Sequence, residues 1–94
     1  MADWKNIMDQ ADNAKRLTIL HPEQGSVLFE ELFKQFGADG MIFYKQAEAL
    51  EALEDYIGAL TGYRKAKVLF TMEKWKVLAQ AGIDRVEKET KQQK

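Results

Sequence analysis

Three carboxylates are spaced so that a helix would place them on one side. Glu48, Glu51 and Asp55 follow one another at intervals of three and four residues, which is the spacing that aligns side chains along a helix. Carboxylate metal sites of helical bundles also need a histidine three residues after a glutamate. The only histidine is His21, which precedes Pro22 in an expected turn. We therefore expect no metal site and no cofactor.

Two further kinds of reactive site are also missing, namely a cysteine nucleophile and a glycine-rich phosphate loop. The sequence contains no cysteine, which excludes thiolate nucleophiles, disulfides and cysteine metal sites. A phosphate loop needs a preceding strand and a following lysine, and Gly37-x-x-Gly40 lacks both. His21 is expected to cap one of the helices that it separates rather than to act as a general acid or base. The protein is predicted not to be an enzyme.

The charge balance argues against a polyanionic partner. Fourteen basic and fifteen acidic side chains give a formal net charge of −1, so no long-range attraction draws in a phosphate backbone. We interpret the local basic residues as a solvated face: Arg64, Lys65, Lys67, Lys74 and Lys76. No apolar run approaches the roughly 18 residues that span a bilayer. We expect a cytoplasmic protein that binds neither nucleic acid nor membranes.

Apolar periodicity and capping signals predict an all-α fold of about five antiparallel helices. Caps are expected at Asp3 and Asp39, the fourth helix is expected to start at Asp55, and helix breaks are expected at His21-Pro22 and Gly37. The expected helices cover about 4–18, 23–36, 41–53, 55–70 and 72–89. The short connection after Leu53 makes the third and fourth helices antiparallel neighbours.

The segment from Phe43 to Thr71 carries small and aromatic residues at the spacing of a helix-pair repeat. It reads Phe43-x-x-Gln46-Ala47-x-x-Leu50, then Tyr56, then Ala59-x-x-x-Tyr63-x-x-Ala66. This pattern resembles a tetratricopeptide repeat, in which small residues let two helix backbones approach closely. The family's usual leucine, turn glycine and closing proline are here Gln46, Glu54 and Thr71.

The resemblance implies a tetratricopeptide-like fragment of an α-solenoid, and a compact helical bundle is the alternative. Residues 1–90 would form one domain with an atypical helix pair at 1–38, a repeat pair at 39–71 and a capping helix at 72–90. Residues 91–94 would be a frayed tail. The positions that pack the repeat would be Phe43, Ala47, Leu50, Ala59, Tyr63 and Ala66.

The resemblance also implies where a partner binds, because the first helix of each pair lines the groove in this family. The matching positions on the third helix are Met41, Tyr44, Glu48, Glu51 and Ala52. Helical spacing independently places Asp55 on the side of Tyr44, Glu48 and Glu51. An acidic groove with an aromatic floor favours a basic peptide, whereas the open alternative is an ordinary solvated helix face.

The function favoured by these observations is a non-enzymatic adaptor that binds a protein segment on its concave face. The alternative is a structural subunit that oligomerises, for instance as a homodimer, through its apolar helices. An adaptor is expected to lose its partner on charge reversal at Glu48 and Glu51 without losing stability. An oligomer is expected to dissociate when Phe29 or Trp4 is truncated. Trp4 and Trp75 are in phase with their apolar stripes and are expected in the core.

Overall fold

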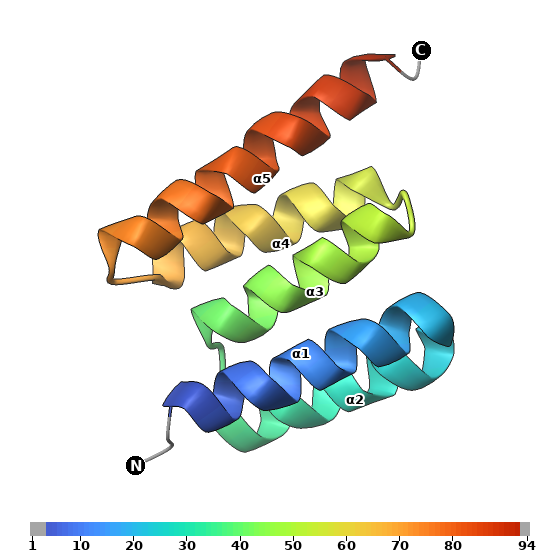
Figure 1. The fold of residues 1–94 in the computed structure, drawn as a ribbon, viewed down its shortest axis with the longest axis vertical. Coiled ribbons are helices and arrows are strands. Elements are labelled where there is room, and N and C mark those ends of the chain that lie inside the picture. The colour runs from blue at the N-terminus through green and yellow to red at the C-terminus, as the bar shows by residue number, and fades with distance from the viewer. Residues whose placement is uncertain (1–3, 93–94) are drawn as a thin grey trace.

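The computed structural model describes residues 4–92, which form five α-helices and no strand (Figure 1). The helices are α1 (Trp4–Leu20), α2 (Pro22–Phe36), α3 (Gly40–Ala52), α4 (Tyr56–Leu69) and α5 (Glu73–Gln92). The predicted all-α class is therefore confirmed. The expected cap at Asp3 and positions 93–94 of the predicted tail lie outside the described residues, whereas Lys91 and Gln92 are part of α5.

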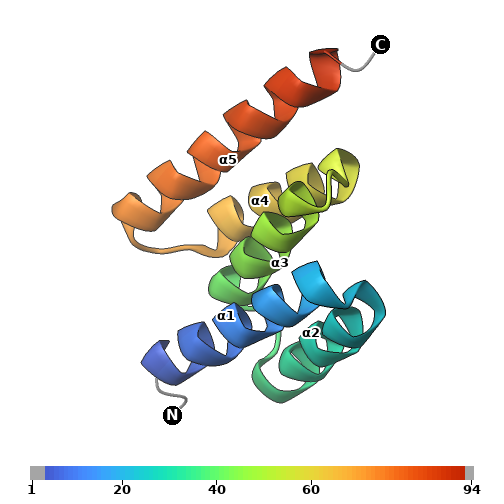
Figure 2. The same ribbon diagram turned by 45° about the vertical axis from the view of Figure 1, so that its right-hand side comes forward.

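The helices form a flat array in which α3 is central. α1 packs against both α2 and α3, α3 packs against α4, and α4 packs against α5, while α2 makes a smaller contact with α3. Figure 1 and Figure 2 show the α1–α2 pair at one end of this array and α5 at the other. The principal extents of 44 × 32 × 16 Å describe a thin molecule. Most side chains are consequently close to one of its two broad faces.

Local chemistry explains three of the helix ends. Asp39 Oδ1 accepts a hydrogen bond from Met41 N at 2.9 Å, and Asp55 Oδ1 accepts one from Gly58 N at 3.1 Å. Both aspartates therefore cap their helices. The cap at Asp39 is as predicted, whereas Asp55 precedes the first residue of α4 instead of being that residue. Gly37 follows α2 with a φ of 78°, a conformation that glycine adopts without strain. His21 precedes α2, but its side chain makes no capping bond there.

Two clusters of buried side chains form the core. The larger cluster joins α3, α4 and α5, and the smaller cluster joins α1 and α2 to Ile42 of α3. A Cβ atom on Gly62 of α4 would lie 3.0 Å from Ala47 Cβ of α3. A Cβ atom on Gly82 of α5 would lie 2.6 Å from Tyr63 Cε1 of α4. Glycines thus permit the close approach of α4 to both of its neighbours.

Some large apolar side chains are exposed, including Trp4, which the sequence places in the core. Trp4 is 46% exposed because it packs on one side only, with its ring centre 5.6 Å from that of Trp75. Val27 is 58% exposed because α2 packs mainly against α1 and turns its opposite side to solvent. Leu53 is 37% exposed because it follows the last residue of α3.

Candidate functional site

The predicted groove face of α3 is largely covered by the chain itself. Met41 and Tyr44 are only 1% and 7% exposed. The Tyr44 ring centre lies 5.6 Å from that of Tyr63 and 6.3 Å from that of Trp75. Both residues belong to the core rather than to an exposed floor. A two-sided amphipathic interpretation of α3 misses this because the helix lies between α1 and α4.

Glu48 links α3 to α1 through ion pairs. Its Oε1 lies 3.4 Å from Lys15 Nζ of α1 and 3.5 Å from Lys45 Nζ one turn earlier on α3. Lys45 Nζ also lies 3.4 Å from Asp12 Oδ1 of α1. The Glu48 side chain is 23% exposed, so this network is partly shielded from water. The negative charge of Glu48 is compensated within the chain.

Glu51 links α3 to both α4 and α5. Tyr63 Oη donates a hydrogen bond to Glu51 Oε1 at 2.6 Å, and Arg85 Nε donates one to Glu51 Oε2 at 3.0 Å. Burial raises the pKa of Glu51, but the hydrogen bonds from Arg85 and Tyr63 outweigh burial and leave the pKa below its usual value. Burial and the Glu51 carboxylate raise the pKa of Tyr63. The phenol therefore remains a donor at neutral pH.

The remaining predicted positions lie at the start of α4 and along the α3–α4 interface. Asp55 is exposed, and its carboxylate caps α4. The predicted packing residues differ in burial: Ala47, Ala59, Tyr63 and Ala66 are fully buried, and Phe43 and Leu50 are half-buried. Ala52 ends α3 and is exposed. Of the predicted groove positions, the structure leaves Ala52 and the three carboxylates near the surface, and each carboxylate already has a hydrogen-bond or ion-pair partner.

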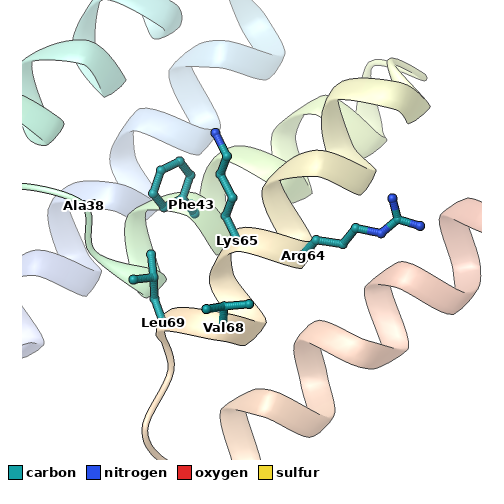
Figure 3. A pocket seen from close by; sticks show the side chains of 6 residues that line it. All are labelled: Ala38, Phe43, Arg64, Lys65, Val68 and Leu69. Atoms are coloured by element: carbon teal, nitrogen blue, oxygen red, sulfur yellow. The ribbon is translucent and has the colours of Figure 1, made fainter.

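An open apolar hollow lies beside α4, and Figure 3 shows the side chains that line it. Its volume is about 500 Å³, and its lining consists of Ala38, Phe43, Arg64, Lys65, Val68 and Leu69. Val68 is 79% exposed and Leu69 is 40% exposed. Exposed aliphatic side chains that gather around a concavity are typical of binding surfaces, whereas single ones need no explanation.

Two cations stand at the rim of this hollow. Lys65 Nζ lies 5.3 Å from the centre of the Phe43 ring, which is a cation–π distance. Arg64 points toward α5 (Figure 3), where its Nη2 lies 3.3 Å from Glu87 Oε2. The Arg64 side chain is 60% exposed, so this ion pair is weak and easily rearranged. The hollow combines an apolar lining with a positive rim.

A second hollow of about 520 Å³ lies between α4 and α5. Its lining consists of Arg64, Lys67, Val68, Lys76 and Ile83. Lys67 Nζ donates to Gln80 Oε1, and Lys76 Nζ donates to the carbonyl oxygen of Lys67 at 2.9 Å. Lys74 lies apart from both hollows, with its Nζ 5.4 Å from the centre of the Trp75 ring. The other four of the five basic residues that the sequence assigns to a solvated face border one or both hollows.

Sequence reasoning missed Val68 and Leu69, the apolar residues that α4 contributes to the first hollow. Val68 follows Arg64, and Leu69 follows Lys65, by four residues. This spacing places each aliphatic side chain beside a cation on the same side of a helix. This spacing is the signal in the sequence that could have pointed to the surface. It does not show that Ala38 and Phe43, which belong to other segments, complete a concavity.

Within residues 4–92, no group of three or more histidine, aspartate or glutamate side chains could hold a metal ion. None of the helices in the described part of the chain is long and apolar enough to cross a membrane. Comparison of the chain with models of protein families, with curated proteins and with solved structures gives no match. The resemblance to tetratricopeptide repeats therefore stays a prediction.

Proposed function

We propose that this chain is a non-catalytic protein-binding domain that receives a segment of a partner protein in the hollow beside α4. The observation that carries the proposal is the exposure of Val68 and Leu69 around a concavity of about 500 Å³. Burying such side chains against a partner contributes about 25 cal/mol for each Å² removed from water. The cations at the rim would orient the bound segment.

The binding surface proposed here lies on α4 rather than on the predicted face of α3. A basic peptide on α3 would have to compete with Lys15, Lys45 and Arg85 for the carboxylates that they already engage. A peptide would gain little from these carboxylates, because each new ion pair would replace one that the chain already has. On α4, a partner would cover Val68 and Leu69 without breaking any of these contacts. The adaptor function is retained, and the surface that performs it is different.

The tetratricopeptide-like helix pair is part of the same proposal. It is supported by the burial of Ala47, Ala59 and Ala66 and by the close contact of Gly62 with Ala47. Small residues between paired helices are what the repeat requires. α5 would then act as the capping helix. A cytoplasmic location is also proposed, and the lack of cysteine supports it.

Site-specific photo-crosslinking tests the proposed surface. A photoreactive amino acid replaces Val68 in one variant and Val27 in the control, because Val27 is also an exposed valine and lies on α2. The cross-linked protein from a native lysate is identified and purified, and its affinity for the wild type and for Val68→Asp is measured. We expect cross-links from residue 68 only and at least about tenfold weaker binding by Val68→Asp, which corresponds to about 1.4 kcal/mol.

The same experiment separates the alternatives. Equal cross-linking from residues 68 and 27 would contradict the proposal. Cross-links from residue 68 to a second copy of this chain, together with a concentration-dependent Tm, would support the oligomeric subunit instead. Phe29 is fully buried within the chain, so its truncation would unfold the domain and would not report on oligomerisation.

A further inference from the structure

The two hollows beside α4 share a common ridge. Arg64 and Val68 line both of them, and their four-residue separation stacks them on one side of α4. The hollow of about 500 Å³ lies toward Phe43, and the hollow of about 520 Å³ lies toward Ile83 of α5. A partner segment that crosses this ridge could place an apolar side chain on each side of it.

The charged side chains of this surface are mainly cationic. Arg64 stands on the ridge, Lys65 borders the first hollow, and Lys67 and Lys76 border the second. Arg64 forms an ion pair with Glu87, whose side chain is 44% exposed. The chain as a whole has a formal net charge of −1, so this concentration of cations is a local feature. Its charge complement is a row of carboxylates.

We propose that the ridge of α4 and its two hollows bind an acidic amphipathic segment of a partner protein. Apolar side chains of that segment would enter the hollows beside Val68, and its carboxylates would face Arg64, Lys65 and Lys67. This inference rests on the proposed protein-binding function and adds the chemistry of the partner.

A nucleic acid fits this surface less well than an acidic protein segment. The first hollow is lined by the apolar side chains of Ala38, Phe43, Val68 and Leu69. A phosphate backbone would meet the cations but would leave the aliphatic side chains without a complementary group. An amphipathic protein segment satisfies both features at once.

Two matched synthetic peptides test the inference. One peptide has leucines on one helical face and glutamates on the other, and the second has lysine at every glutamate position. Dissociation constants come from titrations with ¹⁵N-labelled full-length protein, and shift changes in two-dimensional NMR spectra locate the site. We expect at least about tenfold tighter binding of the acidic peptide. The largest shift changes are expected at Val68, Leu69 and Phe43, and added salt should weaken the binding.

Charge variants show whether the ridge causes the preference. Lys65→Glu is expected to weaken binding of the acidic peptide at least about tenfold, and Lys65→Gln is expected to weaken it less. Lys91→Glu makes the same charge change in the last turn of α5 and should have little effect. Thermal unfolding of each variant shows that it is folded, and Lys65→Gln serves as the test if Lys65→Glu is not.

The possible outcomes separately test the charge of the partner, the binding surface and the class of partner. Equal or tighter binding of the lysine peptide at Val68 and Leu69 would overturn the acidic partner and leave the hollow as a binding site. Shift changes confined to other helices, with either peptide, would overturn both the partner and the proposed surface. A single-stranded oligonucleotide that binds at Lys65 more tightly than the acidic peptide would replace the protein partner with a nucleic acid.

Discussion

Gly82 of α5 lies directly against the ring of Tyr63 of α4. A Cβ atom on Gly82 would be 2.6 Å from Tyr63 Cε1 and 2.7 Å from both Cδ1 and Cζ. Tyr63 is fully buried, and its hydroxyl group donates a hydrogen bond to Glu51. Because the ring is held at both its face and its hydroxyl, it has little freedom to move aside. The close packing of α4 against α5 therefore requires glycine at position 82, because a larger residue would collide with the Tyr63 ring.

Replacing this glycine is expected to destabilise the protein. Alanine is usually better than glycine in a helix by roughly 1 kcal/mol, but overpacking costs about 1–3 kcal/mol. We expect Gly82→Ala to lower the free energy of unfolding by about 1 kcal/mol, measured by urea denaturation. The loss should shrink in a Tyr63→Leu background, because the shorter side chain leaves room. A more stable Gly82→Ala protein would contradict the close contact.

Glu54 occupies the turn between α3 and α4 with a φ of 63°. This left-handed conformation favours glycine. We expect Glu54→Gly to raise the free energy of unfolding by about 0.5–1 kcal/mol, measured by thermal and urea denaturation. Glu54→Ala is the control, because it removes the same carboxylate and keeps a Cβ atom. Equal effects of the two substitutions would show that backbone strain is not the cause.

The elements that local chemistry determines could be predicted from the sequence. Asp39 and Asp55 cap their helices, Pro22 begins α2, and Gly37 follows its end. Each of these signals acts over a few residues, so no knowledge of tertiary contacts is needed. The five helices and their order follow from such signals and from apolar periodicity.

The surfaces could not be predicted in the same way, because they depend on which helices meet. Tyr44 has the spacing of an exposed position, yet Tyr63 and Trp75 cover it. Val68 is apolar and 79% exposed, and the hollow beside it needs Phe43 from another helix. These contacts join residues that are far apart in the sequence, so a one-helix pattern does not report them.

Reversing the charge of Glu48 is expected to destabilise the protein, contrary to the expectation from sequence alone. In the wild type, the Nζ atoms of Lys15 and Lys45 lie 3.4 and 3.5 Å from Glu48 Oε1. Glu48→Lys would therefore place a third cation beside these two lysines. We expect the free energy of unfolding to fall by about 1 kcal/mol, because the pairs are partly shielded from water. Adding Lys15→Glu should recover part of this loss in a double-mutant cycle. If Glu48→Lys is as stable as the wild type, the ion pairs of Glu48 do not stabilise the fold and Glu48 acts as an ordinary surface carboxylate.

The contribution of Glu51 to stability is expected to depend on pH. Its pKa in the folded state is lowered, since the hydrogen bonds from Arg85 and Tyr63 outweigh the opposing effect of burial. A lowered pKa means that the stabilisation is complete above the unfolded-state pKa and is lost as the pH falls through the folded-state value. We therefore expect Glu51→Gln to cost about 1 kcal/mol at neutral pH, a small value because the Arg85 side chain is 51% exposed.

The measurement is the free energy of unfolding of the wild type minus that of Glu51→Gln, determined by urea denaturation at a series of pH values. This difference should be constant above about pH 5 and should shrink as the pH falls below the unfolded-state pKa of about 4.3. In an Arg85→Gln background, the stronger of the two hydrogen-bonding effects on the Glu51 pKa is absent. The stability difference should then depend less on pH, or not at all. A difference that grows toward acidic pH would mean that burial controls Glu51 and that its bridge to α5 does not stabilise the fold.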